Sequence, residues 1–144
     1  MDYGNIAKAL EFFRTRGYIY MDDAPWMVDQ PAYYATKPQE AQADVIKERE
    51  DGTARKFLVA SGEQSFSQMM LVGQPIKRAI CGTPCHRVER YDALRRPAFM
   101  KAELINAHDV DEGHLVHMVH EASAFFEQFF PVRIVKTGYT THCG

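Results

Sequence analysis

Apolar residues near the start of the chain repeat with the spacing of a helix. Ile6, Leu10 and Phe13 recur at intervals of three or four residues, which places them on one helical face. Asn5 is a residue type that caps helix starts, and Gly17 can adopt the left-handed conformation that ends a helix. The pattern therefore predicts an amphipathic helix of about three turns over residues 5–17.

Residues 18–28 alternate loosely between polar and apolar side chains, as a strand does. Pro25 lies inside this run and has no N–H to donate to a sheet, so we expect the strand at a sheet edge or an interface. Trp26 and Met27 are the side chains that we expect it to bury.

A polar, charge-rich segment follows over residues 37–54 and ends in the turn signal Asp51-Gly52. We expect a surface excursion that is partly helical from Ala41 to Lys47. Residues 56–60 then read as a short buried strand. Ser61 and Gln64 fit a capping box, which predicts a helix from that point to about Val72.

Residues 76–85 and 97–107 read as two strands joined by the polar, cationic stretch 87–96. In the second strand one face carries Phe99, Lys101 and Glu103, whereas the other carries Met100, Ala102 and Leu104. A parallel crossover needs about a dozen residues or more, so the two strands must be antiparallel. One face should contact the core, and the other a site or solvent.

The last helical pattern begins at Asp111, a capping residue, and ends before Pro131. Its apolar stripe consists of Leu115, Val119, Ala122, Phe126 and Phe129. Residues 132–138 are the final strand candidate. The order of elements predicts an α+β fold, in which an antiparallel β-sheet is flanked by helices.

The length and composition of the chain predict a single globular domain spanning residues 1–144. The chain has a net charge of -2 and is 46% hydrophobic and 25% charged, so it can build a core without staples. No apolar run approaches the ~20 residues of a membrane span, and three cysteines without a secretory signal favour a reducing, cytoplasmic location. The mild acidity argues against a surface that coats nucleic acid, so an anion site must be local.

The cationic strand pair resembles a known sequence motif. The run "PCHRVE" followed by "FMKAEL" is similar to motif 2 of the class II aminoacyl-tRNA synthetases, and the second strand is most similar to that of the seryl-type branch. In the family's order, "FFRTRGYIYMDDAP" resembles motif 1, and "ASGEQ" resembles the short Thr-x-Glu loop that precedes motif 2. The resemblance covers nearly all of residues 5–138 and implies a class II synthetase-like core.

The resemblance also implies an ATP site. Adenylation of a carboxylic acid develops charge on the α-phosphate, and fixed arginines suit that charge because they bind phosphate oxygens in a bidentate way. By resemblance, Arg87 would be the catalytic contact to the α-phosphate, and Glu89 would bind the adenine amino group. Phe99 would stack on the adenine ring, while Arg95 or Arg96 would reach the terminal phosphates. Mg²⁺ would accompany the ATP.

The substrate implied in the same way is a small amino acid. Glu63 and Glu103 are candidates for its ammonium group, and Lys101 would line the same floor. Simpler interpretations stay open: Glu63 suits the first turn of any helix, and Lys101 and Glu103 could form an exposed ion pair worth under ~1 kcal/mol. Phe99 could be a core residue, and the loop arginines could belong to a solvated turn.

The sequence also departs from the family. His86 stands where an aromatic Phe is usual, and the loop after Glu89 looks short. No segment like the glycine-rich motif 3, with its ATP-clamping arginine, is visible before Gly144, so the core reads as truncated. Arg133 is the only arginine after the motif 2 region. Two functions therefore remain: a ligase-type core that binds ATP and adenylates an amino acid, or an inactive paralogue that serves as a dimeric binding or regulatory module.

Partners and metals complete the expectations. The motif 1-like segment Gly17 to Pro25 predicts a homodimer, and a tRNA acceptor stays open although no tRNA-binding domain is visible. No metal site is expected, because Cys81 and Cys85 lie on one predicted strand, some ~13 Å apart at a strand's rise per residue. The histidines His114, His117 and His120 read as a polar helix face.

Overall fold

The computed structural model describes residues 3–36, 46–48, 55–87, 92–93, 95–108 and 110–136. The elements, in chain order, are α1 (Tyr3–Arg14), β1 (Ile19–Tyr20), β2 (Met27–Val28), α2 (Gln30–Ala35), β3 (Ile46–Glu48), β4 (Arg55–Leu58), α3 (Gly62–Leu71), β5 (Arg78–His86), β6 (Ala98–Asn106) and α4 (Glu112–Phe126). Within the described ranges, no helix is long and apolar enough to cross a membrane.

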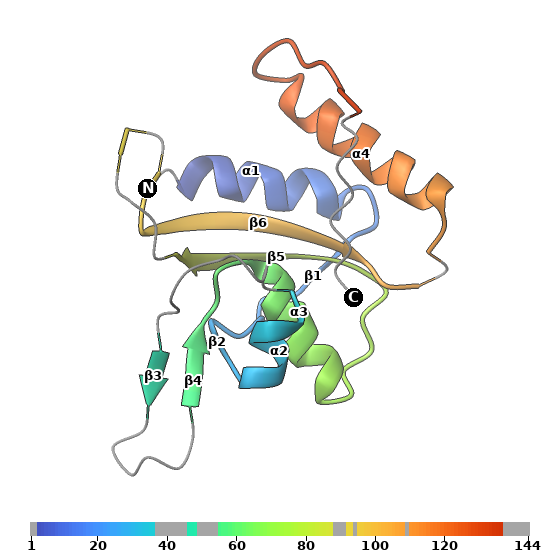
Figure 1. The fold of residues 1–144 in the computed structure, drawn as a ribbon. Helices are drawn as coiled ribbons and strands as arrows, with labels where there is room; N and C mark the ends of the chain where they lie inside the picture. Colours follow the sequence, from blue (N-terminus) through green and yellow to red (C-terminus); the bar gives the residue numbers. More distant parts are fainter. Residues whose placement is uncertain are drawn as a thin grey trace.

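The strands form two small sheets. The first has the order β1-β5-β6, and the second has the order β2-β4-β3. β5 and β6 pair antiparallel from Arg78↔Asn106 to His86↔Ala98, which confirms the predicted strand pair and the α+β class. β1 pairs with β5 in parallel, through Ile19↔Ala79 and Tyr20↔Ile80. The helices lie around these sheets as Figure 1 shows.

The β5–β6 pair separates two packed layers (Figure 1). On one face α1 and α4 contribute to a core cluster with Ile80, Ala102 and Leu104. On the other face α3 packs Phe66 and Met69 with residues that include Ala79 and Cys81. Alternate residues of each strand therefore enter different environments, as the period of two in the sequence predicts.

The first helix is confirmed, with one correction at its start. α1 begins at Tyr3, so Asn5 lies inside it and does not cap it. Gly17 has a φ of 85° and follows the last turn, in the left-handed conformation that we predicted for it. Tyr18 N then donates to Phe13 O at 3.2 Å, which turns the chain into β1.

The single strand expected over residues 18–28 is two short strands in different sheets. The expected burial of Trp26 and Met27 is wrong, because these side chains are 59% and 42% exposed. Val28 is the buried residue of β2, in a cluster with Phe57 of β4, Ala32 and Tyr33 of α2, and Val59. The strand is so short that its alternation turns one residue inward and leaves Met27 outward.

The region around β3 also differs from expectation. Residues 46–48 are a strand paired with β4, so the predicted helix is wrong at its described end, Ile46 and Lys47. Pairing with β4 overrides the local helix preference there. The other residues of the 37–54 excursion lie outside the described residues. α2 was not predicted; Pro31 sits in its first turn, where a missing N–H costs nothing.

α4 has the predicted cap but a different buried face. Asp111 Oδ1 accepts a hydrogen bond from His114 N at 2.8 Å. Met118, Ala122 and Phe125 pack on the core, whereas four residues of the expected stripe are 39% to 60% exposed, namely Leu115, Val119, Phe126 and Phe129. Residues 131–136 form no strand, because the chain there lies beyond the end of α4 and away from both sheets (Figure 1).

Candidate functional site

The predicted site residues gather on the α3 side of the β5–β6 pair. The strand register sets Phe99 beside Cys85, Lys101 beside Thr83 and Glu103 beside Cys81. Directly paired residues of antiparallel strands project from the same face. This face therefore combines an aromatic ring, a cation and a carboxylate along one strand, as the alternation of β6 predicts.

Arg87 lies beside Phe99. Its guanidinium carbon is 5.2 Å from the centroid of the Phe99 ring, a cation–π distance. Its Nε donates to Ala60 O at 3.1 Å, so the backbone before α3 anchors the cation. Phe99 is partly buried, so part of its ring surface stays accessible. Arg87 and Phe99 thus share one accessible face.

Lys101 and Glu103 form a compact polar cluster with Ser61. The Lys101 Nζ lies 2.6 Å from Glu103 Oε2, and the exposed fractions of the two side chains are 34% and 13%. Ser61 Oγ donates to the same carboxylate oxygen at 2.6 Å, and Lys101 Nζ donates to Ser61 Oγ at 3.2 Å. The ion pair that we named as the simpler interpretation of Lys101 and Glu103 is therefore present, but it is partly buried and not exposed.

The role of Ser61 differs from the predicted one. Ser61 is the N-cap residue of α3, but its side chain makes no capping hydrogen bond. Gln64 Oε1 accepts instead from Ala60 N at 2.7 Å, and Gln64 Nε2 donates to Tyr33 O at 2.9 Å. The predicted helix is confirmed, whereas the capping box is wrong because Glu103 on β6 takes the hydroxyl.

Gly62 lets α3 approach the sheet closely at this point. A Cβ at Gly62 would lie 2.7 Å from Glu103 Cβ, which is closer than real Cβ atoms come to other atoms, and 3.0 Å from Cys81 Sγ, which is tighter than most real contacts. Only a glycine fits there without a shift of the helix. The contact sets the first turn of α3, with Glu63, beside the cluster.

The charges of this cluster affect the pKa of Glu63. Partial desolvation raises the pKa of its carboxyl, and the negative charge of Glu103 raises it further, while Lys101 and Arg87 act in the opposite direction. Glu63 itself is exposed, so a ligand can reach it. Four of the predicted residues, Glu63, Arg87, Lys101 and Glu103, therefore form one interacting group.

The thiols beneath this group are inert. Burial raises the pKa of Cys81 to about 12 and also raises that of Cys85, so both stay protonated at neutral pH. Both are free cysteines. Among the residues with described positions, no group of three or more His, Cys, Asp or Glu side chains could hold a metal ion. His142 and Cys143 lie outside the described residues.

The remaining nucleotide candidates are less well placed. Glu89 lies outside the described residues. Arg95 is exposed and binds Asp92, with its Nη1 2.9 Å from Asp92 Oδ2 and its backbone N donating to Asp92 Oδ1 at 2.7 Å. Arg96 is exposed on the same loop. The structure thus gathers the strand residues and leaves the loop arginines at the surface.

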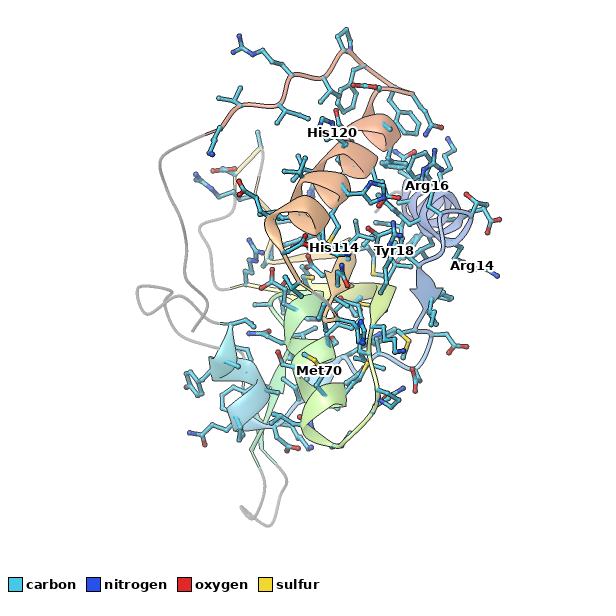
Figure 2. All side chains as sticks on the ribbon, turned by 90° about the vertical axis from the view of Figure 1, so that its right-hand side faces the viewer. Arg14, Arg16, Tyr18, Met70, His114 and His120 are labelled. Atoms are coloured by element: carbon cyan, nitrogen blue, oxygen red, sulfur yellow. The ribbon has the colours of Figure 1, made fainter. Side chains whose placement is uncertain are left out.

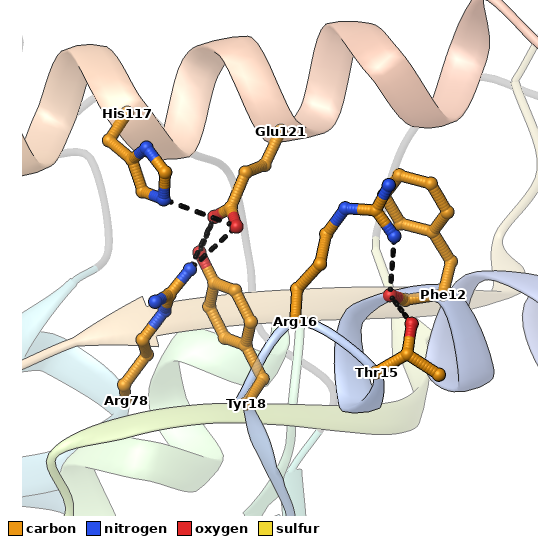
Figure 3. A network of polar contacts seen from close by, with 7 residues as sticks. All are labelled: Phe12, Thr15, Arg16, Tyr18, Arg78, His117 and Glu121. Carbon is orange, nitrogen blue, oxygen red and sulfur yellow. Dashed lines mark hydrogen bonds and ion pairs between the residues drawn. The ribbon is translucent and has the colours of Figure 1, made fainter.

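A second polar network, on the α4 side, was not predicted (Figure 3). Glu121 accepts from Tyr18 Oη at 2.8 Å and from Arg78 Nη2 at 2.6 and 2.7 Å. The Arg78 guanidinium lies 4.2 Å from the centre of the Tyr18 ring. His117 Nε2 is 3.3 Å from Glu121 Oε1. The network joins α4 to β5 and to the turn before β1.

The helix histidines match the expected polar face. His114 and His120 lie at separate turns of α4 (Figure 2). His114 Nδ1 contacts Asp111 Oδ1 at 2.8 Å, and its side chain is 45% exposed. His117 is 61% exposed.

Comparison with known proteins identifies the fold. The structure is similar to the cytoplasmic serine-tRNA ligase of Naegleria fowleri in complex with AMP, with a TM-score of 0.64 and 16% identity over 85% of this chain and 30% of that chain. It is also similar to the seryl-tRNA synthetase of Pyrococcus horikoshii complexed with ATP, with a TM-score of 0.67 and 18% identity over 88% of this chain and 31% of that one.

These similarities show a class II synthetase-like core fold. The chain spans about a third of the length of the two synthetases that it matches. No family model matches the sequence, and no curated protein matches it. The expected fold is confirmed, while the three sequence motifs stay predictions.

Proposed function

We propose that the chain binds ATP on the α3 face of the β5–β6 pair. The observation that carries this proposal is the guanidinium of Arg87 at 5.2 Å from the Phe99 ring. An aromatic plate beside a fixed cation offers the two contacts that an adenine ring and an α-phosphate need. The two structural neighbours, one in complex with AMP and one with ATP, support the same ligand class.

The same face suits a small amino acid as second substrate. Glu63 and Glu103 supply carboxylates for its ammonium group, and Lys101 lies between Glu103 and Phe99 on β6. In the reaction, an oxygen of the amino acid's carboxylate attacks the α-phosphorus, and pyrophosphate leaves. Arg87 would stabilise the charge that develops on the α-phosphate oxygens. The described residues offer no metal cage, so any Mg²⁺ enters with the triphosphate.

Isothermal titration with ATP and Mg²⁺ tests nucleotide binding directly. The unaltered protein should bind, and Arg87→Ala should bind much more weakly. Arg14→Ala is a matched control, because Arg14 pairs with Glu11 on the exposed side of α1. No binding by the unaltered protein, or equal loss in both variants, would contradict the proposal.

A second candidate is a dimeric binding or regulatory module that does not adenylate. The pairing of Arg95 with Asp92 favours it, because this cation is already bound to a carboxylate of its own loop. Pyrophosphate exchange, measured with each amino acid in turn, separates the two. Exchange above background supports the ligase, whereas ATP binding without exchange supports the module. A homodimer through residues 17–25 belongs to both candidates and stays a proposal, as does a tRNA acceptor.

A further inference from the structure

Lys101 lies where the ammonium group of an amino acid would meet Glu103. Its Nζ is 2.6 Å from Glu103 Oε2, and the Glu103 side chain is only 13% exposed. Ser61 Oγ donates to the same carboxylate oxygen at 2.6 Å and accepts from Lys101 Nζ at 3.2 Å. The side chain of a lysine and the α-amino group of an amino acid are both primary ammonium ions. Lys101 therefore already makes the contact with Glu103 that the proposed function gives to the substrate.

A second ammonium group cannot simply be added beside the first. Glu103 Oε2 accepts from both Ser61 and Lys101, and another cation this close to Lys101 would be repelled, strongly so because the cluster is partly desolvated. The charge of Glu63 interacts with that of Glu103, but Glu63 is exposed, so solvent screens its contribution. An incoming ammonium group and Lys101 must therefore compete for Glu103.

The side chain of Lys101 has a second destination on the same face. Lys101 lies between Glu103 and Phe99 on β6, two residues from each, which is about 6.6 Å at the rise of a strand. Arg87 lies beside Phe99, at 5.2 Å from its ring centroid, where the proposed function puts the α-phosphate. Lysine carries its charge on a flexible four-carbon stem, so the ammonium group can turn from one neighbour to the other.

The charge of Lys101 already acts on both ends of this face. Cys81 is the register partner of Glu103, and Cys85 is the register partner of Phe99. Burial raises the pKa of both thiols, and the positive charge of Lys101 acts in the opposite direction at both. The lysine is thus close enough to interact with a carboxylate at one end and with an anion at the other.

We propose that Lys101 is exchanged between Glu103 and the nucleotide: the substrate's ammonium group takes its place at Glu103, and the released lysine binds the α-phosphate beside Arg87. The exchange rests on the ATP and amino-acid sites of the proposed function. ATP alone draws the lysine away and leaves Glu103 without its cation, whereas the amino acid alone leaves the lysine without its anion. Each ligand therefore strengthens the binding of the other, and by the same factor.

Isothermal titration with ATP and Mg²⁺, in the absence and presence of a saturating amino acid, measures this coupling. Each standard amino acid is first screened by thermal unfolding, and the one that gives the largest shift is used. In the unaltered protein it should tighten ATP binding about tenfold or more. Ser61→Ala leaves both charges in place, so it is the matched control and should keep the coupling.

Two substitutions should affect the two ligands in opposite directions. Lys101→Met removes the competing cation, so the amino acid alone should bind more tightly than it does to the unaltered protein. Glu103→Gln releases the lysine, so ATP alone should bind more tightly, and the amino acid more weakly. Both variants should lose the coupling. A merely structural role of either residue would instead weaken both ligands.

Independent binding of the two ligands to the unaltered protein would overturn the exchange, as would weaker amino-acid binding by Lys101→Met. If Lys101→Met does not fold, Glu103→Gln decides, and ATP binding no tighter than that of the unaltered protein would overturn the exchange. Failure of the unaltered protein to bind ATP, or to respond to any amino acid, is a different result. It would contradict the proposed function itself, and the exchange with it.

Discussion

Two carboxylates of the sheet region, Glu121 and Glu103, lie in polar networks on opposite faces and behave differently. Glu121 is 11% exposed and is held by Tyr18, Arg78 and His117 across three segments of the chain. Glu103 is 13% exposed and is held by Ser61 and Lys101, on a face that Glu63 and Phe99 leave accessible. The first network closes an interface inside the protein, while the second lines an accessible face.

The difference separates stability from binding. Substitutions in the Glu121 network should lower the free energy of unfolding and leave ligand binding unchanged. Substitutions on the α3 face should change ligand binding at a small cost in stability.

Glu121→Ala should have the largest effect. Removal of the carboxylate leaves Arg78 and the Tyr18 hydroxyl without their main acceptor, which we expect to lower the free energy of unfolding by about 2 to 3 kcal/mol. Denaturant titration measures it. His120→Ala, on the exposed side of α4, should change stability by less than ~0.5 kcal/mol. A Glu121→Ala variant as stable as the unaltered protein would show that the network does not hold α4.

Arg87→Ala should have the next largest effect, on ligand binding. Loss of one charge-assisted contact to phosphate should weaken ATP binding by about 2 kcal/mol, roughly thirtyfold. Stability should change less than ATP binding, because the hydrogen bond to Ala60 O and the contact with the Phe99 ring are both only partly buried. Isothermal titration beside a denaturant curve measures both. A large loss of stability would mean that Arg87 stabilises the fold, as the residues around Glu121 do.

The contrast also explains which features the sequence predicts. The strand pair β5–β6 follows from alternation and loop length, and the start of α4 follows from a local cap at Asp111. Both depend on residues near one another in the chain. The Tyr18–Glu121 hydrogen bond joins residues 103 apart, and no local pattern encodes it.

The part of the candidate site that lies on one strand was predictable for the same reason, because its residues are near one another in the chain. Phe99, Lys101 and Glu103 share a face because they alternate on one strand. Ser61 was assigned to a helix cap, because nothing in the chain sequence shows that α3 packs close enough for Glu103 to take its hydroxyl. Trp26 and Met27 look like core residues by composition, but the two-residue strand β2 turns only Val28 inward.

Ser61→Ala tests the Glu103 cluster at a smaller scale. The change removes the 2.6 Å hydrogen bond to Glu103 Oε2 and should cost about 1 kcal/mol of unfolding free energy. Ser67→Ala, half-buried in the same helix, is the matched control and should cost clearly less. Equal costs in the two variants would mean that Glu103 does not depend on the Ser61 hydroxyl.

Glu63 should show the smallest effect and the clearest dependence on pH. Its folded-state pKa is raised above the ordinary 4.5, so the folded protein binds the proton more tightly than the unfolded chain does. The resulting stability is present below pH 4.5 and is lost as the pH rises through the raised pKa. Because Glu63 is exposed, Glu63→Gln should change stability at pH 7 by only a few tenths of a kcal/mol, in the stabilising direction.

A bound ammonium ligand should reverse the relative stability of the unaltered protein and Glu63→Gln. A cation beside Glu63 and Glu103 favours the ionised carboxylate, so it lowers the pKa of Glu63 and stabilises the unaltered protein more than the variant. Thermal unfolding from pH 4 to pH 8, with and without a saturating amino acid, measures both situations. If Glu63 binds the ammonium group, Glu63→Gln is slightly more stable than the unaltered protein without ligand and less stabilised by ligand. The same ligand-induced shift in both proteins would remove Glu63 from the amino-acid site and leave its raised pKa as a local consequence of Glu103.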